Sequence, residues 1–301
     1  MPRHAVAVKL SIWPALRQPW NDVVEVARHA DATGWDGFWL ADHFMGDGEA
    51  MAVPTLEVTA ALPALAGETS RIRLGTLVLG NTYRHPAVVA NWAVTVDHLS
   101  GGRMVLGLGA GWQENEHHQY GIPLPSPGER LRRLDEACVV VRTLLRDPIA
   151  RFDGAHYALR DAVCEPKPLG PLPLLLGVRQ DRALRLVARH ADEWNMWAVP
   201  EMLRERDLVL RRHCDELGRD RSAIRTSVQV MVRLTDDEAD AAAFREQHGR
   251  RRSFAGDAGA FADFVAECGE AGADEFIVPD QGLETGQRRL EAMDALRAAV
   301  T

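Results

Sequence analysis

Short apolar runs alternate with longer amphipathic segments along almost the whole chain. An uninterrupted apolar run bounded by turn residues is typical of a strand that is buried on both faces of a parallel sheet. Segments in which apolar residues recur every three or four positions predict helices with one buried face. The runs predict eight strands, at residues 5–12, 38–41, 72–79, 104–108, 172–176, 193–197, 226–234 and 276–279.

Helical periodicity fills most of the segments between these strands. The first helix begins at Asn21 or Asp22, either of which can cap it, and ends at Gly34. Residues 111–128 contain three prolines and predict an irregular insertion, and residues 150–164 predict a small hairpin. The other predicted helices cover residues 55–69, 86–99, 131–145, 182–190, 200–217, 236–248, 258–269 and 287–300.

Strands that alternate with helices in this way predict the α/β class. Eight such units over 301 residues match a (β/α)8 TIM barrel with an insertion after the fourth strand. A doubly wound parallel sheet is the alternative, but the last strand–helix unit continues almost to the C-terminus, which favours the barrel. No linker, repeat or low-complexity segment divides the chain, so we expect residues 1–301 to form a single domain.

Composition excludes several classes of function. The formal net charge of -8 argues against a nucleic-acid-binding face as the main feature. Apolar runs are all shorter than the roughly 18 residues that a membrane helix needs, and the N-terminus lacks the apolar core of a signal peptide, so we expect a cytoplasmic protein. The four cysteines are far apart, which predicts reduced, buried thiols rather than disulfides or a zinc site.

The catalytic residues of such barrels lie at the carboxyl ends of the strands. Asp42 and His43 follow the second predicted strand, and histidine is the side chain that most readily moves protons near neutral pH. A capping aspartate beside a packed histidine is the alternative interpretation of this pair.

Two glycine-containing turns lie at the same end of the predicted barrel. Gly107-x-Gly109-x-Gly111 lacks the third glycine of a dinucleotide fingerprint, because Trp112 stands at that position. The loop would still let backbone approach a flat ring or a phosphate. Gly177 precedes a predicted helix whose first N–H groups could hold a phosphate with help from arginines, although an ordinary surface turn would look the same.

Other catalytic patterns are weak or missing. Glu114, Glu116, His117 and His118 lie close together, but adjacent histidines do not readily face one ion and the zinc-protease spacing HExxH is missing. We therefore expect no metal. The sequence has no nucleophile elbow and no Walker-type phosphate loop, so hydrolase and NTP-driven functions lack support.

Several ordered motifs resemble the luciferase-like monooxygenase superfamily. They are LGTLV at residues 74–78, YRHPA at 83–87, DHLSGGR at 97–103 and LGLGAGW at 106–112. Residues 116–130 are similar to its probable F420-dependent oxidoreductase branch, and residues 184–195 agree as well.

The resemblance implies a (β/α)8 barrel that uses coenzyme F420 or FMN and moves a hydride at the central position of the ring. It places Asp42 and His43 beside the reactive carbon. It also implies a non-proline cis peptide bond between Leu77 and Val78, in a bulge behind the ring. The residues that match the segments holding the ribityl chain and phosphate are Gly107, Gly109, Ala110, Gly111, Trp112, Gly177, Val178, Arg179, Gln180 and Arg182.

Two positions depart from the family pattern. The phosphate turn is usually rich in glycine, whereas here Val178 and Gln180 are poor at positive φ, so phosphate would depend more on arginine. A sugar-phosphate dehydrogenase branch of the family has a glutamate where this chain has Trp112. Since that proton donor is missing, we do not expect a sugar phosphate as substrate.

These observations lead to one main hypothesis and two alternatives. The main hypothesis is hydride transfer between F420 and a small organic substrate, with His43 moving the proton, Asp42 fixing its tautomer, and Trp112, Trp13 and Phe44 lining an apolar pocket. The first alternative is an FMN-dependent monooxygenase that uses oxygen. The second is a non-catalytic flavin-binding protein. By resemblance we also expect a homodimer.

Overall fold

The computed structural model describes residues 7–47, 52–249 and 252–301. Its contacts divide the chain into two compact units, which are described separately. The first comprises Met1–Ala15, Pro19–Trp39 and Val178–Thr301, and the second comprises Leu16–Gln18 and Leu40–Gly177. The expectation of a single domain stays a prediction.

Parallel strands form the centre of the first unit. β1 pairs with β2 and β13, and β10 pairs with β13 and β9. All five residues of β13 are buried, as expected for an apolar strand flanked on both sides. The bounds are β1 Lys9–Trp13, β2 Gly37–Leu40, β9 Glu193–Trp197, β10 Arg225–Gln229 and β13 Glu275–Pro279.

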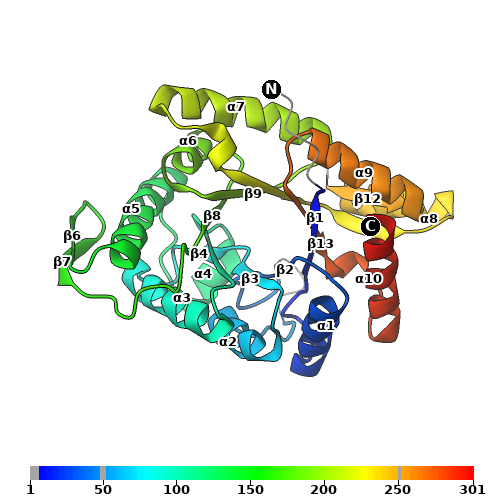
Figure 1. The fold of residues 1–301 in the computed structure, drawn as a ribbon, viewed down its shortest axis with the longest axis horizontal. Helices are drawn as coiled ribbons and strands as arrows, with labels where there is room; N and C mark the ends of the chain where they lie inside the picture. The colour runs from blue at the N-terminus through cyan, green and yellow to red at the C-terminus, as the bar shows by residue number, and fades with distance from the viewer. Residues whose placement is uncertain (1–6, 48–51, 250–251) are drawn as a thin grey trace. The chain divides into compact units, whose positions relative to one another are not determined.

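Helices of the first unit pack against one another as well as on the strands. α7 packs against α6 and α9, and α10 packs against α9 and α1 (Figure 1). The helices are α1 Trp20–Ala32, α6 Asp181–His190, α7 Pro200–Leu217, α8 Glu238–His248, α9 Ala258–Glu270 and α10 Gln287–Ala299, with 3-10 turns at Arg221–Ala223 and Asp280–Gly282.

The predicted seventh strand, residues 226–234, is wrong as a single element. β10 ends at Gln229, and β11 (Met231–Leu234) pairs in parallel with β12 (Ser253–Gly256), a strand that the sequence did not predict. Because the apolar run continues through Val230, the sequence shows no break between the two strands. The extra pair and α8 enclose a small core of their own, formed by Met231, Ala241, Phe244 and Ala255.

In the second unit β5 is the central strand. It pairs in parallel with β3, β4 and β8. α3 packs between α2 and α5 (Figure 1). The strands are β3 Arg73–Thr76, β4 Leu79–Gly80, β5 Met104–Gly109, β6 Ala150–Asp153, β7 Ala158–Ala162 and β8 Leu174–Gly177. The helices are α2 Val58–Glu68, α3 Pro86–Ser100, α4 Glu114–Tyr120 and α5 Pro127–Arg146.

Two predictions in this unit need correction. The predicted strand 72–79 is broken into β3 and β4 by the Leu77–Val78 peptide bond, which is cis. The insertion at residues 111–128 is not irregular throughout, because it contains α4, and α5 begins earlier than predicted, at Pro127. Ser126 caps α5 by accepting from the Glu129 N–H, and proline suits the first helical position that follows.

Other sequence predictions are confirmed. The antiparallel pairing of β6 with β7 forms the hairpin predicted at residues 150–164. All four cysteines are free and buried. Within the described ranges, the helices are too short or too polar to cross a membrane.

A carboxylate of α5 anchors the β6–β7 hairpin. Glu136 of α5 accepts hydrogen bonds from the backbone N–H groups of Ala155, His156 and Tyr157, at 2.9, 2.8 and 3.0 Å. A Cβ atom at Gly154 would lie 2.3 Å from the same carboxylate, so a larger residue there would have to displace the Glu136 side chain. Although desolvation opposes the charge, the three backbone donors lower the pKa of Glu136.

We expect Glu136→Ala to lower the free energy of unfolding by about 2 kcal/mol at pH 7, because three charge-assisted hydrogen bonds are lost. A carboxyl whose folded-state pKa is lowered stabilises above its unfolded value and loses that effect as the pH falls through the folded value. The difference between wild type and variant should therefore shrink below about pH 4.5, the ordinary value for this group. Urea unfolding at pH 7 and pH 4 measures it, and a difference that does not depend on pH would contradict the explanation.

Candidate active site

His43 lies just after β2 and contacts a buried carboxylate from the insertion. Its Nδ1 is 3.0 Å from Oε1 of Glu116, whose side chain is fully buried on α4. The hydroxyl of Tyr83 donates to the same oxygen, and the Phe44 N–H donates to Oε2 at 2.9 Å. Segments far apart in the sequence therefore converge on one carboxyl group.

The surroundings of Glu116 determine the protonation states of Glu116 and Tyr83. Burial disfavours charge on Glu116, but hydrogen bonds from His43, Tyr83 and the Phe44 N–H outweigh it and lower the pKa of Glu116. Burial and the neighbouring Glu116 raise the pKa of Tyr83. Near neutral pH, Glu116 is thus a carboxylate and Tyr83 keeps its hydroxyl proton.

Asp42 does not have the role that the sequence suggested for it. Its carboxylate accepts from the Gly80 N–H at 2.9 Å and from both terminal nitrogens of Arg84, at 2.7 and 3.0 Å. Arg84 also forms an ion pair with Glu57. Consecutive residues leaving a strand point to opposite sides, so Asp42 holds the loop after β4 while His43 contacts Glu116. The prediction that Asp42 fixes the His43 tautomer is wrong.

One aromatic ring contacts His43 in the second unit, and two others pack against the neighbouring residue Phe44. Trp112, which is 58% exposed, meets the His43 ring edge-on at 5.5 Å between centroids. Phe44 lies against Tyr83 and Tyr120, at 4.9 and 5.3 Å. The other predicted wall residue, Trp13, belongs to the first unit, where it contacts Trp197 at 5.6 Å.

The strand-end glycines are required by packing. An ideal Cβ at Gly107 would lie 1.9 Å from the Thr76 carbonyl oxygen. At Gly109 and Gly177 it would lie 2.7 and 2.8 Å from methyl groups of Val78. Thr76 and Val78 thus occupy the space that three side chains would otherwise fill. Gly111 adopts a φ of 80°, where glycine is favoured.

The turn before α6 is built without further glycine. Val178 donates its N–H to the Asn195 carbonyl at 3.2 Å and accepts from Trp194 Nε1 at 2.8 Å. Gln180 is the N-cap residue, with a φ of -69° and no hydrogen bond from its side chain to the helix. Positive φ is therefore not needed at Val178 or Gln180. Arg179 and Arg182 are both exposed beside the start of α6.

The sequence did not identify Glu116 as a partner of His43. Glu116 and His117 were noted as part of the motif at residues 116–130 and as metal ligands that we did not expect, and each has another contact here. His117 bonds the Gln113 carbonyl through Nδ1 at 2.6 Å and Thr82 Oγ1 through Nε2 at 2.8 Å. The 73 residues between His43 and Glu116 leave no local pattern that could have revealed the pair.

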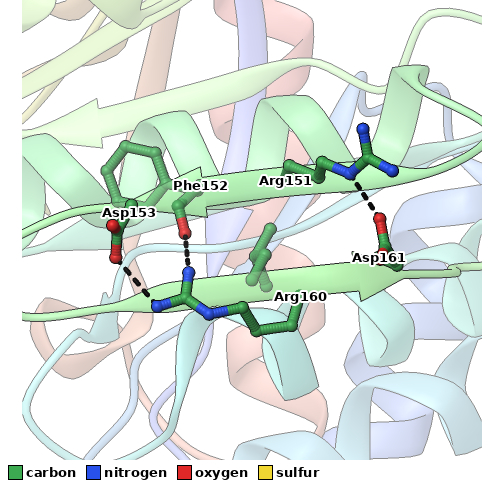
Figure 2. A pocket seen from close by; sticks show the side chains of 6 residues that line it. Arg151, Phe152, Asp153, Arg160 and Asp161 are labelled. Atoms are coloured by element: carbon green, nitrogen blue, oxygen red, sulfur yellow. Dashed lines mark hydrogen bonds and ion pairs between the residues drawn. The ribbon is translucent and has the colours of Figure 1, made fainter.

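A hollow of about 270 Å³ lies elsewhere in the second unit, on the β6–β7 hairpin. Figure 2 shows Arg160 reaching Asp153 and the Phe152 carbonyl, and Arg151 reaching Asp161, across its open surface. None of the residues predicted for the active site lines it. It therefore does not contribute to the candidate site.

Comparison with known proteins identifies the family of this chain and supports its fold. The family described as luciferase-like monooxygenase matches residues 3–301. The chain belongs to the luciferase-like monooxygenase family. Its fold is the predicted (β/α)8 barrel, here with an inserted hairpin.

Relatives of this luciferase-like chain include proteins named for F420. An F420-dependent glucose-6-phosphate dehydrogenase from Kineococcus radiotolerans is 31% identical over 227 residues, which cover 73% of this chain and 66% of that relative. The chain thus spans slightly less than two thirds of the length of that relative.

Solved structures similar to this luciferase-like chain include both an F420-dependent dehydrogenase and a monooxygenase. An F420-dependent secondary alcohol dehydrogenase in complex with an F420-acetone adduct is 19% identical, with a TM-score of 0.87, over 98% of this chain and 100% of that one. A long-chain alkane monooxygenase is 14% identical, with a TM-score of 0.82, over 98% and 91%. At these identities the likeness supports the fold alone.

Proposed function

We propose that the protein transfers a hydride between coenzyme F420 and a small, neutral organic substrate, as an alcohol dehydrogenase or carbonyl reductase. The observation that carries the proposal is the hydrogen bonding of the two ring nitrogens of His43. Its Nδ1 is held by a buried carboxylate, while among the described residues its Nε2 has no hydrogen-bond partner. The ring itself meets exposed Trp112 edge-on. Relatives named for F420 support the choice of cofactor.

The start of α6 fits the anionic group of a phosphate-bearing deazaflavin. In the first unit, the α6 N-terminus carries no side-chain cap, and exposed Arg179 and Arg182 lie beside it, a combination suited to an anionic group. We propose that the start of α6 holds the anionic group of the cofactor.

When bound, F420 would supply the two-electron hydride acceptor or donor. His43 Nε2 would take the hydroxyl proton of an alcohol as its carbon loses hydride, or return that proton to a carbonyl oxygen in the reverse direction. Trp112 places an apolar ring beside His43, which would favour neutral substrates and exclude water. Because this position has no carboxylate, we do not expect this chain to use the sugar phosphate for which the Kineococcus relative is named.

An FMN-dependent monooxygenase is the second candidate. The alkane monooxygenase has the same fold, and the family itself is named for monooxygenation. The two candidates differ in oxygen use, because a deazaflavin does not readily form the oxygen adduct that monooxygenation requires.

The test is turnover with a panel of neutral primary and secondary alcohols and oxidised F420, under argon and in air. We expect the same rate in both atmospheres, and a kcat/KM for the best alcohol at least about tenfold above that for glucose 6-phosphate. The same panel with reduced FMN and oxygen should give no hydroxylated product. Oxygen-dependent turnover with FMN would replace the proposal with the monooxygenase.

A further inference from the structure

We infer that Glu116 is a positioning residue that fixes His43 in the tautomer with its proton on Nδ1, leaving Nε2 as a proton acceptor. The inference rests on the proposed function, in which Nε2 exchanges a proton with substrate. If Glu116 sets the Nδ1–H tautomer of His43, a substitution at Glu116 should reverse it.

The hydrogen-bond donors around Glu116 determine this tautomer. The Phe44 N–H is a backbone donor that cannot reverse, and it donates to Oε2 at 2.9 Å. The Tyr83 hydroxyl donates to Oε1. A carboxylate only accepts hydrogen bonds, so the ring nitrogen 3.0 Å from Oε1 must carry a hydrogen. In a neutral imidazole the other nitrogen, Nε2, then has the free lone pair.

Because Glu116 is buried, its carboxylate depends on its hydrogen-bond donors. The Glu116 side chain has no exposed area, whereas 24% of the His43 side chain is exposed. A fully buried carboxylate needs its donors, because an unsatisfied buried charge is costly. The contact thus stabilises one tautomer of His43 from the protein side and leaves the solvent-facing side of the ring for substrate.

Glu116→Gln should reverse the tautomer. The amide has one accepting oxygen and one donating nitrogen in place of two oxygens. Because the Phe44 N–H is a fixed donor, the amide oxygen should face it, and the NH2 group should face His43 and Tyr83. Tyr83 can rotate its hydroxyl to accept, and His43 can move its proton to Nε2 and accept through Nδ1. The variant would then present an N–H to substrate where the wild type presents a lone pair.

Tyr83→Phe is the matched control. It removes one donor to Oε1 but leaves the carboxylate and its contact with Nδ1 in place. A general disturbance of this cluster would affect both variants, whereas loss of the carboxylate affects only Glu116→Gln. The Nδ1–H tautomer should therefore persist in Tyr83→Phe.

The experiment is long-range 1H–15N NMR of the full chain labelled with 15N-histidine, recorded without cofactor from pH 6 to 9. The His43 signals are assigned as those missing from His43→Asn. We expect Nδ1 protonated and Nε2 unprotonated in the neutral ring of the wild type and of Tyr83→Phe, and the reverse in Glu116→Gln. An Nε2–H wild type, or a Glu116→Gln spectrum like that of the wild type, would overturn the inference.

The outcome is independent of turnover, so it separates this inference from the proposed function. If Glu116→Gln does not fold, the wild-type spectrum alone still decides, because only one tautomer agrees with the inferred role. In the F420-linked assay, Glu116→Gln should lower kcat by up to about 10⁴-fold, as expected when a catalytic histidine takes the wrong tautomer. A correct tautomer in an inactive enzyme would leave the inference intact and remove the proposed function.

Discussion

His43→Asn is expected to lower kcat for alcohol oxidation with F420 by about 10²- to 10⁴-fold, the usual contribution of a positioned acid–base group. Asparagine can still donate to Glu116 through its amide, so the local structure should persist. It has no nitrogen that can exchange a proton with substrate. Steady-state kinetics measures the effect, and F420 binding should change little.

His118→Asn provides the control for this loss. His118 is exposed on the same helix as Glu116, and the same substitution there should leave kcat within about twofold of the wild type. Equal losses in both variants would indicate a general effect on α4. A His43→Asn enzyme with normal kcat would remove His43 from the mechanism.

Gly107→Ala is expected to lower the free energy of unfolding by about 3 kcal/mol or more, because overpacking against backbone cannot be relieved by moving a side chain. The new Cβ would lie 1.9 Å from the Thr76 carbonyl oxygen. Thr76 Oγ1 also accepts from the Gly107 N–H at 3.0 Å and donates to its carbonyl at 2.9 Å, so the two strands are held at this spacing. Urea unfolding measures the change.

Gly67→Ala is the matched substitution. Gly67 lies in α2 with no atom within 4 Å of its added Cβ, and alanine should stabilise that helix by up to about 1 kcal/mol. If Gly107→Ala were as stable as the wild type, β3 and β5 would have to separate more easily than their hydrogen bonds suggest. The glycine would then be explained by the ligand rather than by packing.

Regular elements with a strong local pattern were predicted well from the sequence. The predicted strand 193–197 and helix 200–217 have the bounds of β9 and α7. β11 and β12 were missed because one lies in an apolar run continuous with β10, and the other is a short Ser-Phe-Ala-Gly segment. Their pairing depends on contacts between residues more than 20 positions apart, which no local period encodes.

The candidate site was predicted less completely than the fold. The family motifs directed attention to His43 and to the Leu77–Val78 bond, which is cis. They did not distinguish the roles of Asp42 and Glu116, because those roles depend on which side of the chain each carboxylate faces after folding. The role of the glycines was also predicted incorrectly. Gly107 and Gly109 were expected to leave space for a ligand, but that space is occupied by Thr76 and Val78.

The central claim is the identity of the cofactor, and it is tested most directly by titrating the purified protein with oxidised F420 and, separately, with FMN. Quenching of its eight tryptophans reports binding, with free tryptophan correcting for absorbance. Our account predicts saturable quenching by F420 and much weaker quenching by FMN. Saturation by FMN alone would support the oxygen-using monooxygenase. Binding of neither would show that the protein does not hold a flavin-type cofactor, and would contradict the proposed function.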